Sequence, residues 1–109
     1  MIDLTKIIID KRKITDYLLK HRPEDDKSEF LNNAGYFLEN AEVLLEDIAD
    51  IIKNNDPIYQ STNQFGALYK IFGELAGPNG RILDIVTVWL QNNQSNITHF
   101  VTLYPNKKR

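Results

Sequence analysis

The chain has 109 residues, of which 42% are hydrophobic and 26% charged, a composition typical of one globular domain over residues 1–109. It has no cysteine, which excludes disulfides and thiolate metal sites, and its two histidines, His21 and His99, are far apart without other ligands nearby. We therefore expect neither a metal nor a cofactor. The sequence contains no secretory signal and no apolar stretch of membrane-spanning length, so we expect a cytoplasmic protein with no membrane partner.

Charge is divided unevenly along the chain, although the formal net charge is only −2. Residues 1–56 carry 8 Lys and Arg against 13 Asp and Glu, whereas residues 57–109 carry 5 against 2. A positive C-terminal half would suit phosphate binding. The alternative is that the acidic N-terminal half only provides solvated helix surfaces.

The N-terminal half, residues 1–56, has helical periodicity. Asp10 is placed to cap a helix that reaches about residue 20 and ends before Pro23. A short helix is expected over 26–32. The clearest helix is predicted over 38–53, where apolar residues recur three and four positions apart and acidic residues occupy the other face.

From residue 57 onward the pattern changes to a period of two, which predicts strands. We expect a short strand at 58–59 and longer ones at 65–75, 81–90 and 97–104, with a hairpin turn at Pro78-Asn79-Gly80. Helices followed by strands predict an α+β domain. Its N-terminal helices should pack on one face of a C-terminal, roughly four-stranded antiparallel sheet over residues 57–109.

The alternation also predicts which face of the sheet is open. The aliphatic rows are expected to face the helices: Ile82, Val86, Val88, Leu90, Val101 and Leu103, with His99 as a core histidine. The rows expected on the open face contain Arg81, Thr87, Trp89, Thr98, Thr102 and Tyr104. Hydroxyls, aromatic rings and an arginine on one open face suit a binding site, although threonine and aromatic residues are also good strand formers with no further role.

Several short motifs occur in a fixed order along nearly the whole chain. They are KITDYLL at 13–19, KSEFL at 27–31, Phe65-Gly66 with Tyr69, PNGR at 78–81, TVW at 87–89 and VTLYP at 101–105. The set resembles a family of small bacterial proteins found in toxin–antitoxin pairs and at the C-termini of polymorphic toxins. That family has His-Pro where this chain has Arg22-Pro23, and alanine at the position of Leu103.

The family's architecture is similar to that of the ribonuclease toxins grouped with barnase, EndoU, colicin and RelE. The resemblance implies an endoribonuclease toxin that needs no metal, with RNA as its substrate. It also implies a cognate antitoxin or immunity protein as partner. The oligomeric state is left open.

Cleavage of RNA by its own 2′-hydroxyl needs a base, an acid and groups that hold the phosphate. The catalytic candidates are His21, Lys27, Thr102 and Tyr104. His21 could act as the base, Lys27 could hold the phosphate or stabilise the phosphorane, and Thr102 could hydrogen-bond a phosphate oxygen. Tyr104 could donate a proton or stack on a base.

Three further residues are candidates for substrate binding. Arg81 could hold a phosphate with two hydrogen bonds, Thr87 could add a hydroxyl, and Trp89 could stack on a base or simply pack. A competing hypothesis is a non-catalytic antitoxin or immunity-type binding module. The acidic helices favour it, because inhibitors of nucleases often imitate the charge of RNA.

Overall fold

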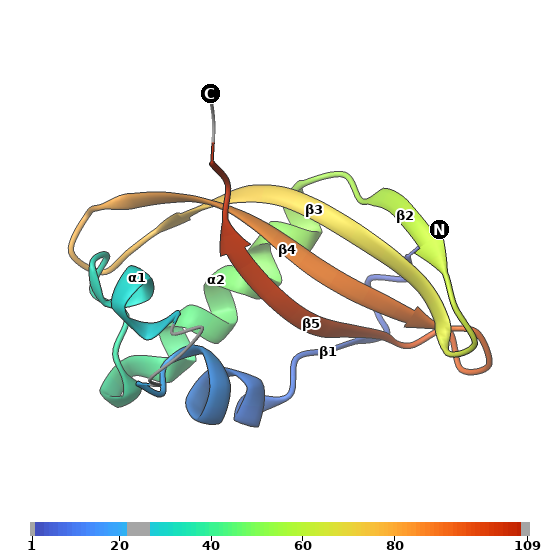
Figure 1. Ribbon diagram of the computed structural model, residues 1–109, viewed down its shortest axis with the longest axis horizontal. Coiled ribbons are helices and arrows are strands. Elements are labelled where there is room, and N and C mark those ends of the chain that lie inside the picture. Colours follow the sequence, from blue (N-terminus) through green and yellow to red (C-terminus); the bar gives the residue numbers. More distant parts are fainter. Residues whose placement is uncertain (1, 22–26, 108–109) are drawn as a thin grey trace.

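The computed structural model describes residues 2–21 and 27–107 as a five-stranded sheet with helices on one side, below the sheet in the view of Figure 1. The elements are β1 (Ile7–Ile8), η1 (Lys13–Leu18), α1 (Ser28–Asn32), η2 (Leu38–Asn40), α2 (Ala41–Asn54), β2 (Ile58–Thr62), β3 (Gly66–Ala76), β4 (Ile82–Asn92) and β5 (Thr98–Pro105). The α+β class is confirmed. None of the helices in the described ranges is long and apolar enough to cross a membrane.

The sheet differs from the prediction at one edge. Its strand order is β1-β5-β4-β3-β2, and β1 pairs with β5 in parallel, so the sheet is mixed and has one strand more than expected. The added strand has only two residues, Ile7 paired with Thr98 and Ile8 paired with His99. A strand this short has no recognisable periodicity, which is why the sequence did not reveal it.

The first helix is shorter than expected, and π-helical over Lys13–Leu18. Asp10 lies at its start, where its carbonyl accepts the Lys13 amide at 2.9 Å and its carboxylate accepts the Arg12 amide at 2.9 Å. The predicted helix end at Pro23 lies outside the described residues. The helix predicted over 38–53 is confirmed in position as η2 followed by α2.

The hydrophobic core lies between α2 and the sheet. Fully or almost fully buried side chains from α2 belong to the same cluster as the inward side chains of β3, β4 and β5: Leu44, Ile48, Ile51, Ile52, Ile71, Leu75, Leu83, Ile85, Trp89, Phe100 and Leu103. Within residues 2–21 and 27–107, no helix packs on the opposite face of β3, β4 and β5, and we call it the open face.

The predicted orientation of β4 was wrong. Ile85, Thr87 and Trp89 are buried against the helices, with no exposed surface at all. Thr87 accepts a hydrogen bond from the Trp89 indole N–H at 2.7 Å and donates its own to the Ile71 carbonyl at 2.8 Å. The error arose because both rows of this strand are rich in large apolar residues, so alternation alone does not say which row faces inward.

The predicted orientation of β5 was correct for only half of the strand, because a bulge interrupts it. Val88 pairs with Thr102 but Trp89 pairs with Phe100, so Val101 has no opposite residue and the alternation shifts there. Before the bulge, Thr98 is buried, contrary to expectation, and Phe100 is buried as well. His99, predicted to face inward, therefore lies on the other face.

The β3–β4 turn is held against the loop that follows α1. The Asn79 side chain donates to the Asn33 carbonyl at 3.0 Å, and the Asn79 amide donates to the Ala34 carbonyl at 3.3 Å. Gly77 permits this contact, since a Cβ there would lie 2.0 Å from the Ala34 carbonyl oxygen. The same loop continues into Tyr36, which is fully buried.

The Tyr36 hydroxyl connects this loop to α2 by donating to the Asp47 carboxylate at 2.6 Å. Burial, together with the hydrogen bond to Asp47, raises the pKa of Tyr36 well above its usual value. The hydroxyl therefore remains a donor at neutral pH. The loop after α1 is anchored to both layers of the domain.

Candidate functional site

The open face carries two rows of side chains that run across three strands. One row is Lys70, Val88 and Thr102, and the next is Phe72, Val86 and Tyr104, each in register from β3 to β5. After the bulge, buried Leu103 points to the core, so Thr102 and Tyr104 on either side of it point outward. This part of the open face therefore combines a cation, two aromatic rings and a hydroxyl over an aliphatic floor.

Tyr17 from η1 reaches this face at the β5 edge. Its hydroxyl lies 3.2 Å from the Thr102 hydroxyl, a hydrogen bond between residues 85 positions apart in the chain. The Lys27 ammonium lies 5.8 Å from the centroid of the Tyr17 ring, and the Lys13 ammonium lies 5.9 Å from it. The hydroxyls of Tyr17 and Thr102 thus lie close to two ammonium groups. Both ammonium groups are at a distance from the Tyr17 ring that is compatible with cation–π attraction.

A concavity of about 630 Å³ opens beside this group, lined by Asp10, Arg12, Lys13, Asp16, Tyr17, Val101 and Thr102. Two of its charges form a pair, because Arg12 lies 3.3 Å from the Asp10 carboxylate. Hydrogen bonds from Arg12 lower the pKa of Asp10, and Asp10 raises the pKa of Arg12. The pair is thus held in its charged form.

A second concavity of about 590 Å³ lies at the end of β5, lined by Lys27, Phe72, Val86, Tyr104, Pro105, Asn106 and Lys107. The Lys70 ammonium lies 5.9 Å from the centroid of the Tyr104 ring. Lys27 contacts the Tyr17 ring and also lines this second concavity. Lys27 therefore links the Tyr17–Thr102 pair to the second concavity.

Three of the catalytic candidates, Lys27, Thr102 and Tyr104, are brought together on this face. His21 is exposed and is the last residue described before the segment 22–26. Thr102 and Tyr104 are half-buried, as is Lys27.

The three substrate-binding candidates lie elsewhere. Thr87 and Trp89 are fully buried on the helix side, so neither can touch a ligand on the open face. Arg81 is exposed and precedes β4 at the hairpin turn. It stands seven residues from Val88, the partner of Thr102, which is roughly 23 Å along a strand.

The domain matches a family model over residues 1–107, under the description "Domain of unknown function (DUF6883)". The chain belongs to this family. A solved structure with the same fold is a chain of a contact-dependent growth inhibition toxin–immunity protein complex from Klebsiella pneumoniae 342. The TM-score is 0.71 at 19% identity, and the match covers 91% of this chain and 99% of that one. No curated protein matches the chain.

In this DUF6883 chain, sequence reasoning missed Tyr17, Lys13 and Lys70 as members of the site. Tyr17 is an aromatic residue in the helical segment KITDYLL, and its ring packs partly on the core. Only its hydroxyl, at the far end of the ring, reaches Thr102. Its position within the KITDYLL motif was the one available signal.

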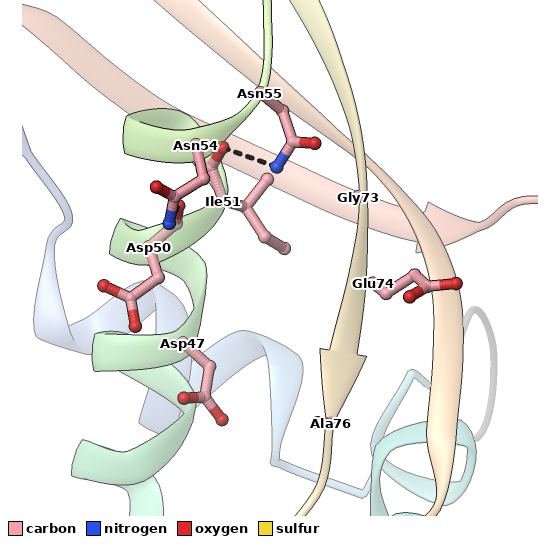
Figure 2. Close-up of a pocket in the computed structure, with 8 residues that line it drawn as sticks. All are labelled: Asp47, Asp50, Ile51, Asn54, Asn55, Gly73, Glu74 and Ala76. Carbon is pink, nitrogen blue, oxygen red and sulfur yellow. Dashed lines mark hydrogen bonds between the residues drawn. The ribbon is translucent and has the colours of Figure 1, made fainter.

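A third hollow in the DUF6883 fold is acidic and lies between α2 and β3, lined by Asp47, Asp50, Glu74, Asn54 and Asn55 among others. In Figure 2 the carboxylates of Asp50 and Glu74 point in opposite directions. Asp47 already accepts the Tyr36 hydroxyl. Within residues 2–21 and 27–107, no three His, Cys, Asp or Glu side chains are grouped so that they could hold a metal ion.

Proposed function

We propose that the chain is a toxin-like, metal-independent endoribonuclease of a bacterial toxin–antitoxin or polymorphic toxin system, and that it cleaves RNA on the open face. The observation that carries this proposal is the convergence of Thr102, Tyr17 and Lys27. The Tyr17 hydroxyl lies 3.2 Å from that of Thr102, and the Lys27 ammonium lies 5.8 Å from the Tyr17 ring centroid. The fold shared with a chain of a toxin–immunity complex supports it.

The proposed reaction is attack of the RNA 2′-hydroxyl on the adjacent phosphorus. A base takes the 2′ proton, the bond from phosphorus to the 5′-oxygen breaks, and an acid protonates that oxygen. The products are a 2′,3′-cyclic phosphate and a 5′-hydroxyl. No oxidant, reductant or further reactant is needed.

Each group at the site suits one task in this reaction. Thr102 donates to a non-bridging phosphate oxygen, and the Lys27 ammonium neutralises charge as the phosphorane forms. Tyr17, hydrogen-bonded to Thr102, supplies the proton for the 5′-oxygen. His21 is the proposed base, because a neutral imidazole nitrogen can accept a proton.

The proposed partner is a cognate antitoxin or immunity protein that covers the open face and keeps the toxin inactive. A second candidate function reverses these roles and makes this chain the antitoxin or immunity-type binding module. The acidic hollow between α2 and β3 favours this alternative, because carboxylates at such a surface could imitate RNA phosphates.

Induced expression in bacteria without a partner gene tests the proposal. We expect the wild type to arrest growth and to produce new RNA fragments on a gel. Thr102→Val, which keeps the side-chain shape but removes the hydroxyl, should relieve both effects. Thr62→Val is the matched control, because Thr62 is an exposed threonine on β2, outside the residues that line either concavity of the open face.

Two other outcomes would point elsewhere. Arrest with intact RNA would retain a toxin but contradict the ribonuclease. Normal growth of cells that contain soluble wild-type protein would favour the binding module.

A further inference from the structure

The second concavity combines apolar walls with polar ends. Its floor includes Val86, which is only 3% exposed although it lies on the open face. Phe72 stands beside it with 43% of its surface exposed, and Tyr104 lies in the same row. A partly exposed phenylalanine in a hollow with a second aromatic ring is a typical surface for stacking a flat ligand.

The polar rim limits what this ligand can be. Lys27 and Lys107 provide positive charge, and Asn106 provides both a hydrogen-bond donor and an acceptor. A nucleotide has a flat base for the rings, polar base edges for an amide and a phosphate for the ammonium groups.

Lys27 relates this hollow to the proposed cleavage site, because it lines the hollow and also contacts the Tyr17 ring. A nucleotide whose base lay between Phe72 and Tyr104 would thus place its phosphate beside Lys27, the proposed stabiliser of the phosphorane. A base in a duplex is paired and stacked on both sides, so it would have to leave the helix to enter.

We infer that the hollow formed by Phe72, Val86, Tyr104, Pro105, Asn106 and Lys107 is a subsite for one unpaired nucleobase of RNA, next to the phosphate that is cleaved. This inference rests on the proposed function and adds a requirement for a single-stranded nucleotide beside the cleaved bond. Phe72 would then provide affinity for an unpaired base, and Asn106 would determine which base is preferred.

The test uses the full chain and short RNA oligonucleotides that contain 2-aminopurine and 2′-fluoro sugars, which bind but cannot be cleaved. When a single strand binds, stacking on an aromatic ring of the protein should quench the 2-aminopurine fluorescence. Addition of the protein to a duplex should not cause this quenching. Phe72→Ala should weaken single-strand binding by about 10- to 100-fold, the usual effect of removing one stacking ring. Phe65→Ala is the control, because Phe65 is a more exposed aromatic residue, at 58%, that does not line the hollow.

Asn106→Ala provides a second variant. Its backbone amide bonds to the Asp84 carbonyl at 2.9 Å and is retained, so the fold should not change. We expect Asn106→Ala to alter the preference among the four bases. Equal affinity of wild type and Phe72→Ala, or equal affinity for single strands and duplexes, would overturn the inference.

The experiment distinguishes failure of the subsite inference from failure of the nuclease proposal. Phe72-dependent binding without cleavage of the matching ribo-oligonucleotide supports the subsite and contradicts the nuclease. Cleavage that does not depend on Phe72 overturns the subsite and retains the nuclease. No binding of any oligonucleotide overturns both.

Discussion

Lys27→Ala is expected to lower the rate of RNA cleavage by purified protein by about 10²- to 10³-fold, the usual cost of removing one group that stabilises charge in the transition state. The Lys27 ammonium lies 5.8 Å from the Tyr17 ring centroid, and Lys27 also lines the hollow at the Tyr104 end of β5. The proposed phosphorane would form beside it. Lys27→Arg should recover part of the rate, because the charge is kept but the shape changes.

The stability of Lys27→Ala should remain close to that of the wild type. Lys27 is the residue before α1, and its side chain makes no capping hydrogen bond there. Lys53→Ala provides a matched control, since Lys53 is an exposed lysine in the last turn of α2. If both variants cleaved at the wild-type rate while melting normally, Lys27 would have no part in the chemistry.

Trp89→Ala is expected to reduce the free energy of unfolding by about 3–5 kcal/mol, as for other large aromatic residues removed from a core. Trp89 is fully buried and packs edge-to-face on Phe100, with ring centroids 5.3 Å apart. Small domains are stable by only about 5–15 kcal/mol, so this loss would be a large share of the total stability. Urea denaturation followed by circular dichroism measures the change.

Trp89→Phe separates packing from substrate binding. It keeps an aromatic ring but removes the indole N–H that bonds Thr87 at 2.7 Å. We expect lower stability but unchanged RNA cleavage below the unfolding transition. A variant that kept full stability but lost RNA binding would restore the original hypothesis that Trp89 stacks on a base.

The sequence predicted the parts of the fold that depend on local patterns. The helix over 38–53 could be predicted because its apolar residues recur at helical spacing, and the turn at Pro78-Asn79-Gly80 because these residue types suit tight turns. The grouping of Thr102 and Tyr104 on the open face followed from their spacing of two. These features need no knowledge of the rest of the chain.

What the sequence could not reveal depends on contacts between distant segments. Both rows of β4 are apolar, so only the packing of α2 decides that Trp89 faces inward. The bulge at Val101 depends on how β5 pairs with β4. The hydrogen bond between Tyr17 and Thr102 joins residues 85 positions apart, and no local pattern predicts such a contact.

The most direct measurement compares cleavage by purified wild-type protein, in EDTA, of an RNA and of the same RNA with 2′-deoxy sugars. We predict that the RNA is cut to products with 2′,3′-cyclic phosphate and 5′-hydroxyl ends, and that each 2′-deoxy position is resistant. Intact RNA after incubation with folded protein, or cutting at 2′-deoxy positions, would contradict the proposed function.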